Sequence, residues 1–439
     1  MTDDRLPILL VILDGLGDRG CANLGNLTPC EAARTHNLNA LASRGACGVH
    51  VPFGPGRATS SETAHWALFG FGDLPFPGRA LLEILGVGAR APLGEPLFHL
   101  ALRASTLRDQ RLWLGARARP RIDDILCGKL FASLEGRRID GVSFELLPLR
   151  TGECVLLARG AGTRDVSDTD ALFDTVHPWM RPRALPESDH PELARKLAAT
   201  LQQWLLESRS ILHAHPGNRL RQAAGLPPLD VAVTKWASRH DGTLPDFAAL
   251  TGLRGAAVTD TALYRGFARL LGMTLVDLPY DAANPADDMR QRLAAAARLL
   301  HDHDFVHVHV KATDEAAHTK NPLHKRDVIE ATDAGLASLL DMAGQAVVAV
   351  TGDHASPSTG ALLHSGDPTP LVVAAPGLRA DSVTEFGERS CISGELGRMC
   401  AADILPLLAG YANRPFFIGH RPGSAMTLAM PSRPEPFPL

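Results

Sequence analysis

Uninterrupted apolar runs, each followed by polar residues that open a turn or a helix, mark the first and last parts of this 439-residue chain. Residues 7–13 and 346–351 are two such runs, residues 305–310 form a third run that includes His307 and His309, and another apolar stretch begins at Pro370. Short runs without alternation are typical of strands buried on both faces, as in a parallel sheet between layers of helices. The alternation of such strands with helical segments predicts an α/β fold with a mainly parallel sheet sandwiched by helices.

The middle of the chain follows a different pattern. From residue 97 to residue 248 the periodicity is less regular and arginine is frequent, and strand–helix alternation resumes afterwards. A chain of this length exceeds one ordinary hydrophobic core. We therefore expect a discontinuous core domain, formed by residues 1–96 and 249–439, with residues 97–248 inserted as a second, α+β domain.

Composition excludes several classes of protein. Hydrophobic residues make up 45% of the chain, charged residues 21%, and the net charge is −4. We find no basic stripe of the kind that binds nucleic acid, and no stretch with the length and apolarity of a membrane span. The cysteines are scattered and odd in number, seven in all, which favours a reduced, cytoplasmic compartment. A small anionic substrate stays compatible, because local charge sets that preference.

Polar fragments follow the predicted strands of the core. They are LDGLGD with Asp14, SSETAH with Ser61, KATDEAAH with Asp314 and His318, TGDHA with Asp353 and His354, and HSGDPTP with His364. Because the carboxyl ends of parallel strands meet at one edge, we expect these side chains to converge there. Asp314 and His318 are four residues apart and share a helix face. Carboxylates combined with imidazoles suit Mn or Zn better than Ca.

Each fragment taken alone also has a commoner structural explanation. Asp14-Gly15 after a strand is usually a turn, and an Asp–His pair on a helix is usually solvated. Ser61 stands where a helix begins, so it serves either as an N-cap or as a nucleophile beside free backbone N–H groups. A serine hydroxyl needs activation, which coordination to a divalent metal supplies. The conjunction of the fragments favours a metal centre.

Together these fragments resemble the alkaline phosphatase superfamily and, within it, the archaeal-type cofactor-independent phosphoglycerate mutases. The resemblance covers nearly the whole chain and includes VILDGLGD, SETAHWALFGF, HPGNRLRQAAGLPP, KRDVIEATD and HSGDPTP in order. It implies an alkaline-phosphatase-like core with an inserted lid domain. It also implies that Ser61 becomes phosphoserine and that the phosphate then returns to the other hydroxyl of a small phosphorylated metabolite, here 2- or 3-phosphoglycerate.

The resemblance further implies a role for each matching residue. Two divalent metal ions are expected, Mn first and Zn or Mg as alternatives. Lys311 matches a lysine that helps to neutralise the phosphate. The expected ligands are Asp14, Ser61, Asp353 and His354 for one ion, and Asp314, His318 and His364 for the other.

The departures from the family pattern lie in the substrate region. Arg103-Ala104-Ser105 stands where the family has Arg-Gly-Asn, and Lys235-Trp236 where it has Arg-Gly. The segment with Asp168 and Asp170 resembles the lid aspartate region. We take Arg103, Asp168, Asp170 and Lys235 as candidate substrate-binding residues. Two alternatives stay open: a phosphatase or phosphotransferase for another small phosphorylated or phosphonate metabolite, and a metal-binding pseudoenzyme. The sequence sets no oligomeric state.

Overall fold

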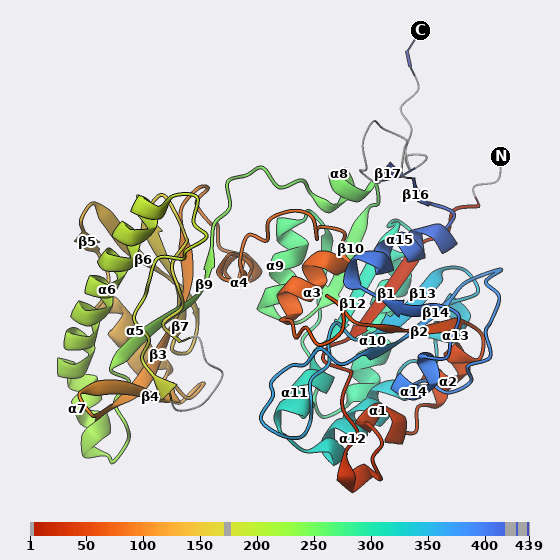
Figure 1. The fold of residues 1–439 in the computed structure, drawn as a ribbon, viewed down its shortest axis with the longest axis horizontal. Coiled ribbons are helices and arrows are strands. Elements are labelled where there is room, and N and C mark those ends of the chain that lie inside the picture. The colour runs from red at the N-terminus through yellow and green to blue at the C-terminus, as the bar shows by residue number, and fades with distance from the viewer. Residues whose placement is uncertain (1–3, 171–176, 418–426, 429–436, 439) are drawn as a thin grey trace. The chain divides into compact units, whose positions relative to one another are not determined.

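The computed structural model describes residues 4–170, 177–417, 427–428 and 437–438. The chain forms two compact units, unit 1 from residues 1–76 and 245–439, and unit 2 from residues 77–244 (Figure 1). The sequence had placed the first boundary at residue 97. The division lies earlier because helix α4 (Arg79–Gly86) packs against strands β3 (Leu97–Arg108) and β9 (Val231–Ser238) of unit 2.

Unit 1 is built on a twisted sheet with the strand order β11-β10-β12-β1-β13-β14-β2-β15. The strands from β11 to β13 are parallel, β14 is antiparallel to both of its neighbours, and β15 is parallel to β2. The predicted mainly parallel sheet is therefore confirmed. Its strands are β1 (Ile8–Leu13), β2 (Ala46–His50), β10 (Gly255–Thr259), β11 (Thr274–Asp277), β12 (Phe305–Val310), β13 (Val347–Thr351), β14 (Thr369–Ala374) and β15 (Gly397–Met399).

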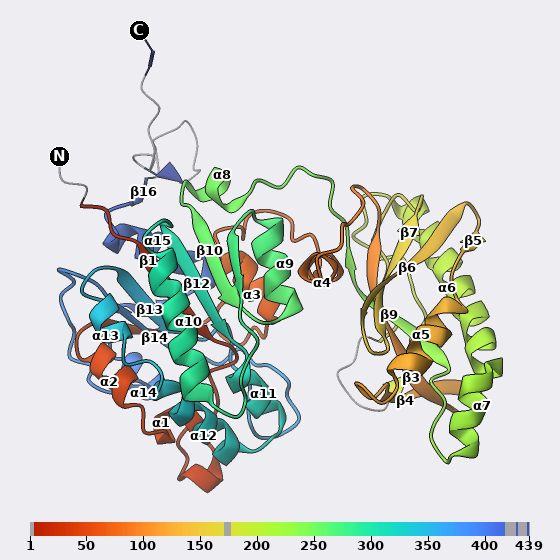
Figure 2. The ribbon, with the colours of Figure 1, turned by 180° about the vertical axis from the view of Figure 1, so that it is seen from behind.

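Strand β1 shows why the apolar runs become central strands. Every residue from Ile8 to Leu13 is buried, and β1 pairs in register with β12 on one side and β13 on the other. Leu9, Val11 and Leu13 share a hydrophobic core with helices α2 (His36–Ala42), α10 (Pro285–Leu299) and α12 (Pro322–Asp333). Figure 1 shows α3 (Ser61–Leu68) and α15 (Ala401–Tyr411) in front of the sheet, and Figure 2 shows α10 across its other face. Alternate residues of each strand thus pack against different helical layers.

Shorter helices complete unit 1. A capping box begins α1, where the Thr28 hydroxyl accepts from the Glu31 N–H and the Glu31 carboxylate accepts from the Thr28 N–H. These helices are α1 (Pro29–Ala32), α8 (Phe247–Thr251), α9 (Ala262–Leu270), α11 (Ala312–His318), α13 (Leu339–Met342) and α14 (Glu388–Cys391), with a 3-10 turn at Ala22–Leu24. Strands β16 (Phe416–Phe417) and β17 (Thr427–Leu428) form a small antiparallel pair.

Unit 2 is an antiparallel sheet packed against helices, in the order β5-β6-β7-β3-β4-β8 with β9 also paired to β3. Helix α6 (Pro191–Ala214) buries Leu197, Leu201 and Trp204 in a core shared with Phe98 and Phe144 of the sheet. The other elements are β4 (Arg111–Arg117), β5 (Arg137–Ile139), β6 (Val142–Arg150), β7 (Glu153–Arg159), β8 (His177–Pro178), α5 (Asp124–Ala132) and α7 (Pro216–Ala223). Within the described ranges, every helix is too short or too polar to span a bilayer.

Candidate metal centre

The topology of unit 1 brings the predicted fragments to one sheet edge. Asp14 directly follows β1, Asp314 lies in α11 just after β12, and Asp353 follows β13 by two residues. Because these three strands are parallel, their carboxyl ends lie side by side. Strand β14 is antiparallel, so the loop before it, with His364, lies at the same edge. Strand β2 runs against β14, so its carboxyl end also lies there and leads to α3 and Ser61.

One candidate ligand group consists of Asp14, Asp353 and His354. All three side chains are fully buried, and the ligand atoms they offer lie within 4.8 Å of one another. The His354 Nε2 atom is 3.5 Å from Asp14 Oδ1 and 3.4 Å from Asp353 Oδ2. Ser61 Oγ lies 2.8 Å from the same Nε2 atom. We call Asp14, Asp353 and His354 the first ligand group.

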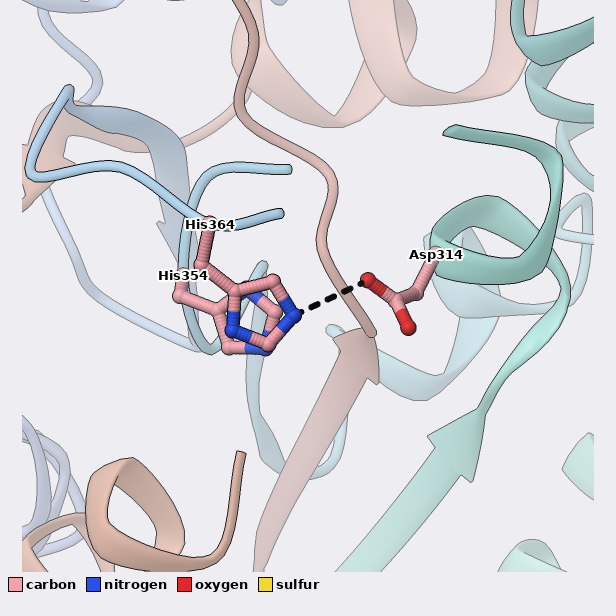
Figure 3. Close-up of side chains that lie close together, drawn as sticks. All are labelled: Asp314, His354 and His364. Atoms are coloured by element: carbon pink, nitrogen blue, oxygen red, sulfur yellow. Dashed lines mark ion pairs between the residues drawn. The ribbon is translucent and has the colours of Figure 1, made fainter. Parts of the chain in front are cut away.

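A second ligand group consists of Asp314, His354 and His364, whose ligand atoms also lie within 4.8 Å of one another (Figure 3). The His364 Nε2 atom is 3.6 Å from Asp314 Oδ1, and the His354 and His364 rings stack at 3.9 Å between centroids. The His364 Nδ1–H donates to the Thr59 carbonyl over 2.8 Å, which leaves the Nε2 lone pair free for a ligand bond. His354 belongs to both groups.

His318 lies next to Asp314 at the edge of the second ligand group. The resemblance assigned it, with Asp314 and His364, to one ion. In the structure, His354 completes the group with those two residues, and His318 lies beside it, with Nε2 3.0 Å from Asp314 Oδ2. The His318 side chain is 32% exposed, whereas the side chains of His354 and Asp314 are buried. His318 therefore borders the second ligand group from the solvent side.

The residues of both groups fit divalent cations. Asp14 Oδ1 and Asp353 Oδ2 are buried and, among the described residues, have no hydrogen-bond donor. A buried carboxylate oxygen without a donor is costly, and a bound cation removes that cost. Burial lowers the pKa of His354, and burial followed by repulsion from His354 lowers the pKa of His364 to about 4. Both imidazoles are thus neutral at pH 7, as metal ligands must be.

Lys311 supplies a fixed positive charge between the two groups. Its Nζ atom lies 2.9 Å from Asp14 Oδ2 and 2.6 Å from Asp314 Oδ2. Burial opposes the charged form of Lys311, but attraction to Asp14 and Asp314 outweighs it and raises the lysine pKa. Burial likewise opposes ionisation of Asp14, and Lys311 with His309 lowers the Asp14 pKa far below its usual range. Asp14 and Lys311 are therefore both charged at neutral pH.

Ser61 and Ser60 have separate surroundings at the start of α3. Ser60 is the N-cap residue, yet its side chain does not cap the helix, and its Oγ lies 3.1 Å from Thr63 Oγ1. Ser61 is the first helical residue and is 4% exposed, and its Oγ lies within hydrogen-bond distance, 2.8 Å, of His354 Nε2. Its oxygen lies at the positive end of the helix dipole, which favours bound anions such as phosphate.

The candidate substrate residues form one cluster within unit 2. Arg103 Nη1 donates to Asp170 Oδ2 over 3.0 Å, and Lys235 Nζ lies 3.8 Å from the same oxygen. Asp168 accepts a hydrogen bond from the Trp236 backbone N–H over 3.0 Å. Burial first, and then repulsion from Asp170, raises the pKa of Asp168 to about 6 despite opposing contributions from Trp236 and Lys235. Arg103, Asp170 and Lys235 are buried and Asp168 is partly exposed, and the cluster combines both signs of charge.

Sequence reasoning missed several residues that support these sites. In unit 1, Tyr264 and His309 both contact Asp14. The signal for His309 is present in FVHVHV, where a histidine interrupts an apolar strand just before Lys311. In unit 2, His177 contacts Asp170 over 2.9 Å. Trp236 has a φ of 57°, a conformation that favours glycine. The Arg79 Cζ and Lys235 Nζ atoms lie 3.9 Å and 4.2 Å from the centroid of its ring, as in cation–π contacts.

Comparisons with known proteins show which family the chain resembles over most of its length. The profile of the Metalloenzyme superfamily matches residues 6–409. A 2,3-bisphosphoglycerate-independent phosphoglycerate mutase from Ignicoccus hospitalis is 35% identical over 419 residues, which cover 93% of this chain and 98% of the relative. Among solved structures, the PH0037 protein from Pyrococcus horikoshii matches with a TM-score of 0.75 and 29% identity, over 94% of this chain and 99% of that one. The cofactor-independent phosphoglycerate mutase from Thermoplasma acidophilum matches with a TM-score of 0.60 and 28% identity, over 93% of this chain and 99% of that one.

Proposed function

Because the chain belongs to the Metalloenzyme superfamily and, within it, to the 2,3-bisphosphoglycerate-independent phosphoglycerate mutases, we propose that it interconverts 2- and 3-phosphoglycerate through Ser61. The observation that carries the proposal is the position of the Ser61 hydroxyl. Its Oγ atom lies 2.8 Å from Nε2 of His354, the imidazole that both ligand groups share. A hydroxyl in that position is a ligand and a nucleophile at once.

The proposed reaction has two mirrored transfers. Ser61 Oγ attacks phosphorus, the bond from phosphorus to the donor oxygen breaks, and the serine proton passes to that oxygen, which leaves phosphoserine and glycerate. The other glycerate hydroxyl then attacks the phosphoserine, and Ser61 recovers a proton. The Lys311 ammonium compensates the negative charge of the phosphoryl oxygens. Two divalent cations, when bound, polarise the phosphoryl oxygens and lower the pKa of a coordinated hydroxyl.

We propose Mn as the preferred metal, with Asp14, Asp353, His354 and Ser61 around one ion. Asp314, His318 and His364 hold the other ion, and the 3.0 Å contact between His318 and Asp314 supports this set. Mixed carboxylate and imidazole donors support this choice. We further propose that Arg103, Asp168, Asp170 and Lys235 recognise the polar groups of the substrate. Their mutual contacts within unit 2 support a preorganised charge pattern.

The test is the product formed from 3-phosphoglycerate in the presence of Mn. We expect 2-phosphoglycerate to accumulate to an equilibrium mixture, and the same mixture to form from 2-phosphoglycerate, as followed by phosphorus NMR. Release of inorganic phosphate in place of the isomer would identify a phosphatase. Metal-loaded protein that neither isomerises nor hydrolyses 3-phosphoglycerate would contradict the proposal.

Removal of divalent cations is expected to abolish turnover, because the carboxylates of both ligand groups would then face the phosphate without compensation. EDTA treatment followed by gel filtration gives the apoprotein, and added Mn should restore activity more fully than Zn or Mg. Elemental analysis of the reconstituted protein should give about two ions per chain, as a two-metal site requires. Full activity of the apoprotein, or a stoichiometry of one, would contradict this prediction.

A further inference from the structure

Among the described residues, Asp14 accepts hydrogen bonds at only one of its carboxylate oxygens. The Tyr264 hydroxyl donates to Asp14 Oδ2 over 3.0 Å, and His309 Nε2 donates to the same atom over 2.9 Å. Asp14 Oδ1, by contrast, is buried without a hydrogen-bond partner in the described part of the chain and faces His354 Nε2 at 3.5 Å. The donors therefore fix which oxygen is available to the first ligand group.

Lys311 Nζ also donates to Asp14 Oδ2, over 2.9 Å, and the two ring donors hold each other in place. Tyr264 lies on α9 and is 2% exposed, and His309 lies on β12 opposite Ile12 of β1 and is fully buried. Their rings pack with centroids 3.5 Å apart, so neither side chain can turn without displacing the other. Their place next to β1, which leads directly into Asp14, gives the carboxylate a rigid support.

The ring of His65 extends this support from Asp14 to Ser61 and Asp353. His65 is fully buried and packs against Tyr264 with centroids 4.5 Å apart. Its Nδ1 atom lies 2.8 Å from the Ser61 carbonyl oxygen and 3.5 Å from Asp353 Oδ2. Tyr264 is thus central to a buried layer that contacts Asp14 and the Ser61 side chain directly and reaches Asp353 through His65.

The second ligand group has different supports. Ser356 Oγ donates to Asp314 Oδ1 over 2.6 Å, and the Thr59 carbonyl accepts from His364. Lys311 contacts both Asp14 and Asp314 and so serves both groups. Among the described residues, Tyr264 contacts a ligand of the first group, Asp14, and no ligand of the second group.

We propose that Tyr264 is a positioning residue that sets the affinity of the first ligand group for its metal ion, independently of the second group. Its hydroxyl, together with His309, holds Asp14 Oδ2 so that Oδ1 points toward Asp353 and His354. Loss of such a second-layer hydrogen bond typically costs 10- to 100-fold in metal affinity. The inference rests on the proposed function only in requiring that both groups bind metal.

The experiment is a Mn²⁺ titration of full-length apoprotein, with free Mn²⁺ measured by electron paramagnetic resonance. In Tyr264→Phe, which keeps the ring and its packing, we expect one binding phase to weaken about 10- to 100-fold and the other to stay unchanged. Tyr411→Phe, at the end of α15, removes a tyrosine hydroxyl elsewhere in unit 1 and should leave both phases unchanged. No phosphoglycerate is needed, so a wrong substrate assignment leaves this test intact.

Repeating the titration in a His364→Ala variant identifies which of the two ions Tyr264→Phe affects. His364→Ala removes a ligand of the second group only, so the remaining Mn²⁺ phase reports on the first group. Adding Tyr264→Phe in that background should weaken the remaining phase by the same factor as in the wild-type background. Unchanged Mn²⁺ affinities in both backgrounds, or equal weakening of both phases in Tyr264→Phe alone, would overturn the proposal. Thermal melting by circular dichroism checks that each variant is folded.

Discussion

Ser61→Ala is expected to lower phosphoryl transfer by roughly 10⁴- to 10⁶-fold, the range seen when a covalent nucleophile is removed. The Ser61 hydroxyl is the group placed between His354 and the positive end of α3, and alanine offers no atom that could form a phosphoenzyme. The fold should persist, because the change removes one oxygen from a side chain at the start of a helix. At least one metal ion should still bind, because the second ligand group does not include Ser61.

Ser60→Ala is the matched control. Ser60 precedes Ser61 by one residue, but its hydroxyl contacts Thr63 and does not reach the ligand groups. This variant should keep turnover within a few-fold of wild type, and substrate labelled on phosphate should leave label on the protein after acid quenching. The same trapping in Ser61→Ala should give none. Turnover near wild type in Ser61→Ala would refute the covalent mechanism.

The sequence was sufficient to predict the core of unit 1 because its strands are buried on both faces. The run at 305–310 matches β12, and the run at 346–351 matches β13 to within one residue. The direction of β14 could not be predicted, since an apolar run is the same for a parallel and an antiparallel strand. The boundary of unit 2 was placed too late because α4 has an ordinary amphipathic pattern that does not show which sheet it packs on.

The candidate ligands could be predicted because they follow strands directly or lie on the next helix. Tyr264 could not, because its contact with Asp14 joins residues 250 positions apart and depends on how α9 packs against the sheet. The sharing of His354 between both ligand groups could not be predicted either, since it depends on where the packed chain places the imidazole relative to Asp14 and Asp314. Sequence patterns place elements, whereas such contacts arise from the packing of side chains.

The second large expected effect, on stability, concerns a buried ion pair that links the two loops carrying ligands of the first group. Lys325 of α12 and Asp18 are both fully buried, with Lys325 Nζ 3.0 Å from Asp18 Oδ2. The same ammonium donates to the carbonyl oxygens of Gly17, over 3.0 Å, and Ser356, over 2.9 Å. It therefore joins the loop after β1, which carries Asp14, to the loop after β13, which carries Asp353 and His354.

Lys325→Met is expected to lower the free energy of unfolding of unit 1 by about 3–5 kcal/mol, the usual cost of removing one partner of a buried ion pair. Methionine keeps the length of the side chain but leaves the Asp18 carboxylate and two carbonyl oxygens without their cation. Urea unfolding followed by tryptophan fluorescence measures the change. Arg326→Met is the control, because Arg326 pairs with Asp327 at the surface and should matter by less than about 1 kcal/mol.

A double variant separates the cost of a stranded charge from the loss of packing. Asp18→Asn in the Lys325→Met background removes the unpaired carboxylate while keeping a side chain that can accept from the Ser358 N–H, which Asp18 binds over 3.1 Å. Because the stranded charge dominates the penalty, the double variant should be more stable than Lys325→Met alone. Equal stability of the two would mean that the ammonium acts mainly through the carbonyls of Gly17 and Ser356. A Lys325→Met variant as stable as Arg326→Met would show that the pair does not hold the two metal-ligand loops together.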